Sequence, residues 1–478
     1  MRWGGFSYEF IRPIRSVVAI LGSELVDMEI YGVKSKMAFY PHRNYGYDMV
    51  EFGSIDEYFT ALENNGIILQ ASKRRQKILD EFKIIEQNSG LKIELDEDLL
   101  DEVVAITEMP TALIGSFEKE FLEVPSEVIV TSMKENQRYF PLRDKDNKLS
   151  NHFVVVSNAI SSDSQLIIKG NEKVLRARLS DAKFFWESDL ASEFSSAKLK
   201  NITYLAGLGS MYDKEIRERE IARELAKIYE KELKYEFGGE FIDELDRAVM
   251  LSKADLTTAM VYEFTDLQGI MGSYYAKHRN ENHFIVEAIK EQYLPNKEGS
   301  ECPKSYFSSI VALSAKLDTL MGLFSINKIP TGNKDPYALR RAAAGVIRIV
   351  LNLNIQFDIK NILSLIAKNY APFDLGLLES FIYDRLYTMY SVNPSVIKAC
   401  LNSSVSDIKR LNSAIIALDD ITKNSEFKEN FSTFKRLANI IKDSQILAVD
   451  EKLMEHDSER VLHSAFSALS LDISDTKR

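Results

Sequence analysis

A glycine turn and several basic side chains at residues 332–341 form the first pattern that could do chemistry. Lys334 directly precedes a segment in which a proline marks the first turn of a predicted helix, and Arg340, Arg341 and Arg348 follow within that helix. Because a helix N-terminus presents free N–H groups to anions, this pattern fits a contact with a phosphate or an RNA backbone. The alternative is an ordinary proline-initiated helix whose arginines pair with neighbouring carboxylates.

Two further basic clusters lie beside aromatic residues. The first contains Lys134, Gln137, Arg138, Tyr139 and Phe140, and the second contains Lys169, Lys173, Arg176, Arg178, Lys183, Phe184, Phe185 and Trp186. At helical spacing Lys169, Lys173 and Arg176 share one face, as contacts along a phosphate backbone require. Phe184 and Trp186 are predicted to belong to the core, and a platform for base stacking is the alternative.

Standard catalytic motifs are absent from the sequence. It holds no G-x-x-x-x-G-K-[ST] phosphate loop, no G-x-S-x-G nucleophile elbow and no H-E-x-x-H zinc motif. The six histidines lack ligand spacing, and Cys302 and Cys400 are too far apart to indicate a zinc site or a disulfide framework. The His456-Asp457 pair lies in a polar stretch and is predicted to be solvated surface. The residues therefore indicate neither a metal nor a covalent nucleophile.

The elements that must position the basic clusters are predicted to be mostly helical, because glycine (21) and proline (11) are sparse over 478 residues. The first ~70 residues mix short strands with one helix, and two helices follow; the predicted ranges are 16–21, 28–33, 54–64, 72–90 and 96–108. The clearest sheet is predicted at 128–133, 137–142 and 153–157, with a hairpin turn at 144–147.

Beyond residue 167 nearly everything is predicted to be helix, near 172–190, 211–234, 242–264, 282–293, 304–325, 336–351, 358–369, 375–391, 405–421 and 431–445. Changes of domain near residues 195 and 352 divide the chain into an α/β module (1–194), a helical domain (195–351) and a helical C-terminal region (352–478). The predicted fold class is therefore mostly α, multidomain, with an N-terminal α+β portion.

Charge and composition limit the classes of function. The 60 lysines and arginines against 71 acidic residues give a net charge of −11, which argues against a protein that coats nucleic acid indiscriminately. A local basic patch can still bind phosphates. The apolar runs fall far below the ~18 residues of a membrane span, and two cysteines fit the reducing cytoplasm.

Several ordered sequence blocks closely resemble the beta subunit of bacterial heterotetrameric glycyl-tRNA synthetase. They are RWG (2–4), FIRPIR (10–15), QRYFP (137–141), GNEKVLRARLSDAKFFW (170–186), LGSMYDK (208–214), KADL (253–256), VYEFTDLQGIMG (261–272) and GNKDPYALRR (332–341). The resemblance covers residues 1 to about 350 and is weak from about 352 onward. Family chains carry a further segment before the first block and complete an anticodon-binding helical domain, so both ends of this chain are expected to be cut.

The resemblance implies a part in joining glycine to its tRNA in an assembly of two alpha and two beta subunits. The alpha subunit is expected to hold the catalytic site with ATP and Mg, while this chain binds no cofactor, is inactive alone, and positions the tRNA 3′ end. The candidate tRNA-binding residues are Lys134, Arg138, Lys173, Arg176, Arg178, Lys334, Arg340 and Arg341.

The family's middle helical region is similar to HD phosphohydrolases, which hold a metal with separated His, His-Asp and Asp ligands. At the corresponding places this sequence has Leu205, Ala254 before Asp255, and Asp318. Two carboxylates without imidazole partners make a poor transition-metal site. We therefore expect a degenerate HD-like domain without a metal, in which both aspartates are structural acceptors that pair with Lys253 or Lys316. A metal-dependent phosphohydrolase and a purely structural assembly scaffold are the alternative functions.

Overall fold

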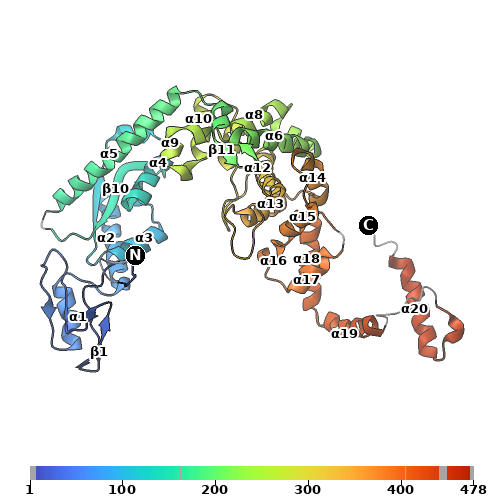
Figure 1. Cartoon of the computed structure of the whole chain (residues 1–478), viewed down its shortest axis with the longest axis horizontal. Helices are drawn as coiled ribbons and strands as arrows, with labels where there is room; N and C mark the ends of the chain where they lie inside the picture. Colours follow the sequence, from blue (N-terminus) through green and yellow to red (C-terminus); the bar gives the residue numbers. More distant parts are fainter. Residues whose placement is uncertain (1–6, 162, 404, 441–448, 474–478) are drawn as a thin grey trace. The chain divides into compact units, whose positions relative to one another are not determined.

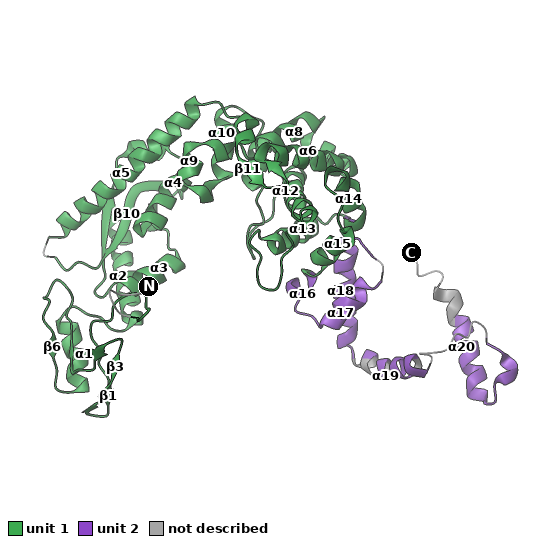
Figure 2. Cartoon of the chain, viewed as in Figure 1, with its two compact units in different colours: residues 1–355, 359–385 green, residues 356–358, 386–478 purple. Residues whose placement is uncertain are grey.

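The computed structural model describes residues 7–161, 163–403, 405–440 and 449–473 (Figure 1). The chain divides into two compact units, of which unit 1 comprises Met1–Ile355 and Ile359–Arg385 and unit 2 comprises Gln356–Asp358 and Leu386–Arg478 (Figure 2). Helices dominate the described residues, and the named strands all lie before residue 211. This confirms the predicted mostly helical fold with an N-terminal α+β portion. The RWG block at 2–4 lies outside the described residues.

The N-terminal part of unit 1 consists of small two-stranded hairpins and one helix. Its elements are β1 (Ile20–Leu21), β2 (Glu24–Leu25), β3 (Glu29–Ile30), β4 (Val33–Lys34), β5 (Ala38–Phe39), β6 (Val50–Glu51) and α1 (Ile55–Asn64). The predicted helix at 54–64 is confirmed, because the Ser54 hydroxyl accepts the Glu57 N–H at 3.2 Å and caps α1. Phe39, Phe52 and Leu62 form the small core of this part.

A four-stranded antiparallel sheet follows, with the strand order β7-β9-β10-β8. The elements of this part are α2 (Ala71–Ser89), β7 (Lys92–Ile93), α3 (Glu97–Ile106), β8 (Thr111–Ser116), the 3-10 helix η1 (Lys119–Glu123), α4 (Ser126–Thr131), the π-helix η2 (Ser132–Gln137), β9 (Tyr139–Arg143), β10 (Leu149–Ser157) and α5 (Ser164–Ala191). The predicted strands at 137–142 and 153–157 and the turn between them are confirmed.

Helices cover both faces of this sheet. Phe140 and Val154 pack in a cluster with side chains of α2 and α3. Phe153 and Val155 point to the other side, in a larger cluster with side chains of α4 and α5. This alternation is the two-residue period of a strand. One side of α5 is buried against this second cluster, and the opposite side of the helix faces solvent.

The predicted strand at 128–133 is wrong, because these residues form α4 and the start of η2. Their β-branched composition favours a strand, but the segment begins directly after Pro125 and buries Val128, Ile129 and Met133. The fourth strand is instead β8, which forms the sheet edge beside β10. Tertiary packing at this point outweighs local β propensity.

The second part of unit 1 is helical. It contains η3 (Ser196–Asn201), β11 (Thr203–Leu205), β12 (Gly209–Ser210), α6 (Met211–Ile228), α7 (Glu230–Phe237), α8 (Ile242–Leu251), η4 (Ala254–Thr257), α9 (Ala259–Glu263), η5 (Thr265–Leu267), α10 (Ile270–His278), α11 (His283–Glu291), α12 (Tyr306–Ser325), α13 (Leu339–Leu353), α14 (Ile359–Ile366), η6 (Ala367–Asn369) and α15 (Leu375–Tyr383). The predicted helices at 211–234 and 242–264 are each interrupted, and α10 was not predicted.

Helix α12 is the centre of this helical part and packs against α6, α11 and α13. Seventeen of its 20 residues are buried. It is the one helix in the described ranges whose length and mean hydropathy (1.3) would suit a membrane span, but 89% of that stretch is buried within the protein. Its apolar composition is therefore explained by its place in the core.

Unit 2 is built from helices. They are α16 (Leu386–Met389), α17 (Pro394–Leu401), α18 (Ile408–Lys423), α19 (Ser425–Ile440), the 3-10 helix η7 (Glu451–Leu453) and α20 (Asp457–Ile473). The Asp407 side chain accepts the Phe357 N–H at 2.6 Å and the Arg410 N–H at 2.8 Å, which fixes the start of α18. The last part of the helix predicted at 431–445 lies outside the described residues.

Candidate nucleic-acid interface and a buried ion-pair network

Helix α5 presents basic side chains on its exposed face. It begins where the Asp163 carboxylate accepts the Gln165 and Leu166 N–H groups at 3.0 and 3.3 Å. Leu175, Leu179 and Ala182 anchor its buried side. Lys169, Lys173 and Arg176 are exposed, as their helical spacing predicts.

Phe184 lies on the same exposed face of α5, since positions 169, 173, 176, 180 and 184 are three or four residues apart. Its side chain is 66% exposed, so the prediction that Phe184 belongs to the core is wrong. The prediction for Trp186 is confirmed, because that ring packs against the core and stacks on Tyr275 with centroids 5.3 Å apart. We call Lys169, Lys173, Arg176 and Phe184 the α5 stripe.

Acidic side chains neutralise part of the positive charge of the predicted basic surface. The Arg176 Nε donates to Glu118 Oε1 at 2.5 Å, but this arginine is half exposed and its ion pair is a surface pair. Arg178 lies 3.6 Å from Glu263. Within the described residues, Lys169 and Lys173 form no ion pair, and the charge of both remains open to a ligand.

Lys134 and Arg138 hold the sheet region together. The Lys134 Nζ donates to Glu94 Oε1 at 2.8 Å and to Asp96 Oδ2 at 3.3 Å, so this lysine is enclosed by two carboxylates. Arg138 has a left-handed backbone (φ 61°), and its Nε donates to Glu102 Oε1 at 2.7 Å. Both predicted phosphate contacts therefore have acidic partners within the chain.

The segment at 332–341 differs from both sequence interpretations. Helix α13 begins at Leu339 rather than at the proline, and the Asp335 carboxylate accepts the Leu339 and Arg340 N–H groups, both at 2.9 Å. The amides predicted to face an anion are thus taken by a side chain of the same loop.

The basic side chains of this segment contact backbone carbonyls rather than carboxylates. Arg340 donates to the Gly332 carbonyl, and Arg341 donates to the Asn296 carbonyl at 3.0 Å. Arg348 donates to Lys297 O at 2.9 Å and also to Ser300 O. Lys334 is exposed, and its ammonium has no ion pair in the described part of the chain.

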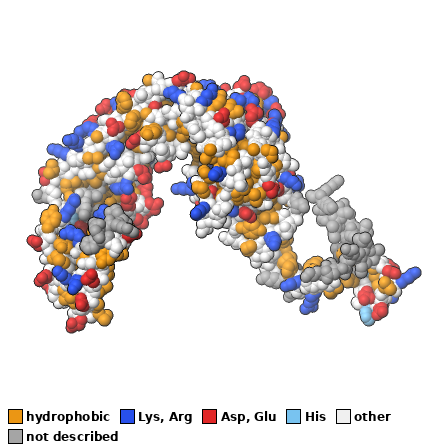
Figure 3. All heavy atoms as spheres, viewed as in Figure 1, with side chains coloured by type: hydrophobic (Ala, Val, Ile, Leu, Met, Phe, Trp, Pro, Cys, Tyr) orange, Lys and Arg blue, Asp and Glu red, His pale blue; other side chains and the backbone are white. Residues whose placement is uncertain are grey.

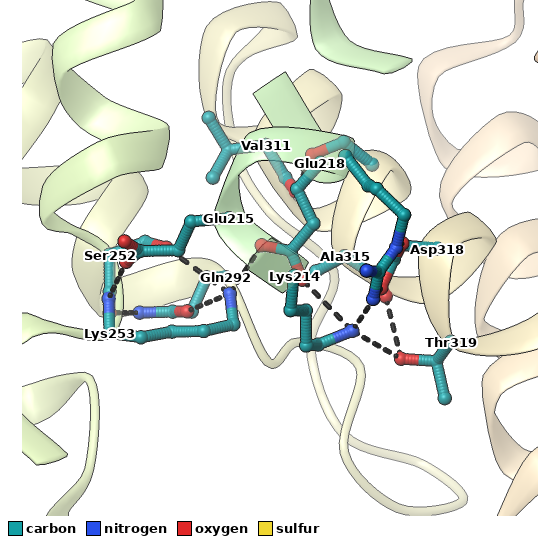
Figure 4. Close-up of polar contacts among 12 residues, drawn as sticks. Lys214, Glu215, Glu218, Ser252, Lys253, Gln292, Val311, Ala315, Asp318 and Thr319 are labelled. Carbon is teal, nitrogen blue, oxygen red and sulfur yellow. Dashed lines mark hydrogen bonds and ion pairs between the residues drawn. The ribbon is translucent and has the colours of Figure 1, made fainter. Parts of the chain in front are cut away.

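A buried network surrounds Asp318 at the centre of α12 (Figure 4). Its Oδ2 accepts the Lys214 Nζ at 2.7 Å, and its Oδ1 accepts the Arg217 Nε at 2.7 Å and the Tyr370 hydroxyl at 2.6 Å. Burial would raise the pKa of Asp318, but Lys214 and Arg217 outweigh it and hold that pKa low. The expected partners Lys253 and Lys316 are therefore wrong for Asp318.

Glu218 joins this network to Lys253 (Figure 4). Its Oε1 lies 3.1 Å from the Lys214 Nζ, and its Oε2 accepts the Lys253 Nζ at 2.5 Å. The neighbouring Glu215 accepts the Lys253 backbone N–H at 3.2 Å. Burial raises the pKa of Glu215 to about 9, which keeps this carboxyl protonated at neutral pH.

Asp255 has a different structural role. Its Oδ2 accepts the Gly269 N–H at 2.6 Å and the Gly272 N–H at 3.0 Å, at the beginning of α10. Burial raises the pKa of Asp255 to about 6, although these amides oppose the shift. Asp255 is therefore a structural acceptor, as expected, but for backbone amides rather than for Lys253.

The HD-like positions hold no ligand set for a metal. Asp318 is enclosed by two cations, Asp255 faces backbone amides, and Leu205 lies in β11. Across the ranges that the structure describes, no group of three His, Cys, Asp or Glu side chains could hold a metal ion. The sequence signal for the network is the presence of Asp318 inside the largely apolar α12, because an aspartate is rarely fully buried unless it is paired.

Comparison with known proteins identifies the family. The family model for the glycyl-tRNA synthetase beta subunit matches residues 1–402. The chain is 45% identical to the glycine–tRNA ligase beta subunit of Helicobacter pylori (strain Shi470), over 98% of this chain and 69% of that protein. It is 37% identical to that of Limosilactobacillus reuteri (strain DSM 20016), over 98% and 70%. The corresponding protein of Clostridioides difficile (strain 630) is 35% identical, over 99% and 70%.

These matches run through both units and include the α5 stripe, the buried network and the segment at 332–341. The chain spans about 70% of the length of these relatives. With a family model that covers residues 1–402 and relatives that match nearly its whole length, the chain belongs to the family of glycyl-tRNA synthetase beta subunits, which are subunits of glycine–tRNA ligase.

Proposed function

We propose that this chain is the tRNA-binding subunit of a cytoplasmic glycine–tRNA ligase and that it positions glycine tRNA for attachment of glycine. The observation that carries the tRNA-binding role is the α5 stripe, where Lys169 and Lys173 have no acidic partner among the described residues and Phe184 is exposed beside them. Family membership supplies the reaction in which such a surface acts.

The α5 stripe suits an RNA backbone and an unpaired base. Lysine ammonium groups along one helix face release counterions when they contact successive phosphates. An exposed aromatic ring offers a stacking surface for a base that has left its helix. Arg176 adds a third cation, because a surface pair such as that with Glu118 is worth only about 0–1 kcal/mol and exchanges readily for a phosphate.

In this proposal the chemistry occurs on an alpha subunit, which binds ATP and Mg in an assembly of two alpha and two beta subunits. This chain contributes by holding the tRNA in place, since fixed orientation removes much of the entropic barrier of the transfer. The helical part of unit 1 then acts as a degenerate HD-like scaffold in which Asp318 forms ion pairs and Asp255 accepts backbone N–H groups.

The basic patch is local. On the face drawn in Figure 3, Lys and Arg side chains lie among Asp and Glu side chains, and hydrophobic side chains separate them. Such a surface fits the net charge of −11 and restricts phosphate binding to places where cations lack partners. Lys134, Arg138, Arg178, Arg340 and Arg341 remain predicted tRNA contacts, and the exposed Lys334 is the strongest of the predicted residues at 332–341.

The test is binding of the chain to glycine tRNA and to a non-cognate tRNA across a salt series. The logarithm of affinity should fall linearly with the logarithm of salt concentration, and K169Q/K173Q should lower that slope by about two. F184A should weaken binding with little change in slope. The matched control is K231Q/K328Q, which removes two exposed lysines elsewhere in unit 1.

Two outcomes would contradict the proposal. Equal effects of the stripe and control variants would show that the α5 stripe is not the interface. No binding of either tRNA at low salt would assign this chain to the scaffold alternative, and contact with the alpha subunit alone would then explain its presence in the enzyme.

A further inference from the structure

A cavity of about 740 Å³ lies in the helical part of unit 1, lined by α11, the segment at 292–305, α12 and α13. Its lining has seven lysine or arginine side chains against four acidic ones. Five of these cations form no ion pair within the described residues, namely Lys290, Lys297, Lys304, Lys316 and Arg341. The cavity is therefore electropositive in a chain whose net charge is −11.

Lys316 is the buried member of this set. Only 9% of it is exposed, and its Nζ donates to the Tyr293 carbonyl at 3.1 Å. Burial is the main cause that lowers the pKa of Lys316, to about 8, and repulsion from Arg341 and Arg348 adds to it. The ammonium is still mostly protonated at pH 7, and a buried charge without a counter-charge is costly.

The lining acids do not supply that counter-charge. Glu291 accepts the Lys304 backbone N–H at 3.0 Å, burial raises its pKa, and among the described residues it forms no ion pair with a lining cation. Asp266, Glu287 and Glu301 form no ion pair with a lining cation in the part of the chain that the structure describes.

Gly345 of α13 provides the space for the Lys316 side chain. A Cβ at this position would lie 2.8 Å from Lys316 Cε and 2.9 Å from its Cδ. Glycine inside a helix lowers helix stability relative to alanine. Because Gly345 has no side chain, the Lys316 side chain can lie against α13 and reach the cavity.

The other side of the cavity is held in position by two arginines of α13. Arg341 donates to Asn296 O at 3.0 Å, and Arg348 donates to Lys297 O at 2.9 Å and to Ser300 O. These contacts fix the loop that carries Lys297 before any ligand binds. A cationic site that is formed in advance loses little entropy on binding.

We propose that this cavity binds a small multiply charged phosphate ligand, such as pyrophosphate or the phosphates of a nucleotide, through Lys316, Lys297, Lys304 and Arg341. Several separate cations favour a ligand with several negative charges, and lysine binds phosphate as a point charge. The cavity volume is sufficient for a nucleotide. The proposal does not depend on the α5 stripe, which contributes no residue to this lining; of the predicted tRNA contacts, only Arg341 also lines the cavity.

The test is calorimetric titration of the full chain with pyrophosphate at constant ionic strength. Saturable binding is expected, and K316Q should weaken it at least tenfold. K297Q/K304Q changes only exposed side chains and should weaken binding several-fold even if K316Q disturbs folding. K328Q is the matched control, because it removes one lysine of unit 1 outside the cavity.

G345A tests the geometry. The added methyl group should displace the Lys316 side chain and weaken pyrophosphate binding, while the melting temperature stays the same or rises because alanine favours the helix. The proposal is overturned if the unaltered chain shows no saturable binding, or if K316Q, K297Q/K304Q and K328Q all bind pyrophosphate equally.

Competition identifies the source of the phosphate. Displacement of pyrophosphate by ATP but not by tRNA would support a free nucleotide as the ligand, whereas displacement by tRNA would support an RNA phosphate in the same cavity. The variant K169Q/K173Q should leave pyrophosphate binding unchanged, so failure of the tRNA proposal would not affect this result.

Discussion

The buried charges around Asp318 in unit 1 are retained because each is matched to a partner. Asp318 of α12 accepts hydrogen bonds from Lys214 and Arg217 of α6. Glu218 of α6 accepts one from Lys253. Removing one member of such a network leaves an uncompensated charge in the interior, which costs more than the pair itself contributes. The network therefore fixes how α6 packs against α12.

Asp318→Asn should lower the free energy of unfolding by about 3–5 kcal/mol, because Arg217 would lose its buried counter-charge and Lys214 would keep only Glu218, which also pairs with Lys253. Urea unfolding followed by circular dichroism measures this loss. Asp181→Asn, on the exposed side of α5, is the control and should change stability by less than about 0.5 kcal/mol. Equal stability of the two variants would contradict the structural role of the network.

Glu215 should make the protein less stable as pH rises. Its carboxyl titrates near 4.5 when unfolded and at about 9 in the fold, so between these values the folded state keeps a proton that the unfolded state has lost. Stability then falls by up to about 1.4 kcal/mol per pH unit from this group. Glu215→Gln keeps an acceptor for the Lys253 N–H and removes this dependence.

Glu215→Gln should therefore match the unaltered chain near pH 5 and exceed its stability at pH 8. Urea unfolding of both proteins at pH 5, 6.5 and 8 gives the difference directly, so other titrating groups cancel. Glu298→Gln, in an exposed loop, should keep the original slope. A constant difference between the Glu215→Gln variant and the unaltered chain would contradict a protonated Glu215.

At the scale of elements, Asp189 connects α5 to the helical part of unit 1. Its carboxylate accepts the Ala259 and Met260 N–H groups, both at 3.0 Å, and the Tyr275 hydroxyl at 2.8 Å. One buried side chain at the end of α5 thus caps α9 and contacts α10. This connection gives the exposed face of α5 a fixed place relative to the core that supports it.

Asp189→Ala should expose the amides of α9 to solvent. Removing the Asp189 carboxylate takes away the acceptor of three donors, namely the Ala259 and Met260 N–H groups and the Tyr275 hydroxyl. Each donor left unsatisfied in the interior costs about 1–3 kcal/mol. Hydrogen exchange at residues 259–263 should accelerate, while exchange in β10 stays unchanged. Asp181→Ala, an exposed change on the same helix, is the control. Unchanged exchange at 259–263 would show that the cap does not hold α9.

At the scale of the whole molecule, family membership and the buried network point to a division of work. The HD-like positions carry ion pairs and amide contacts instead of metal ligands in the described residues. The catalytic step is accordingly assigned, in our proposal, to the alpha subunit.

The chain alone should give no glycine-dependent exchange of pyrophosphate into ATP above background, and addition of the alpha subunit should give exchange. The alpha subunit alone is the control that separates adenylate formation from tRNA transfer. Pyrophosphate exchange by the purified chain that is reduced in Asp318→Asn but not in Asp181→Asn would contradict the proposed division. It would instead support an active site in the helical part of unit 1.

Residue patterns within single elements were predictable from the sequence. Local periodicity and turn residues determine four of these features: the mostly helical structure, the cap at Ser54, the β9–β10 hairpin and the basic face of α5. The family also followed from ordered sequence blocks, because these need no knowledge of the fold. The error at 128–133 arose where β-branched residues are helical under tertiary packing.

Only the tertiary structure decided which charges are available. The sequence marks Lys134, Arg138 and Lys173 as similar basic residues. The first two meet carboxylates from distant positions, whereas Lys173 meets none in the part of the chain that the structure describes. The exposure of Phe184 and the cation-lined cavity around Lys316 depend in the same way on contacts between distant segments. Local sequence sets the type and the face of a side chain, whereas burial and charge compensation are set by elements that meet only in the folded chain.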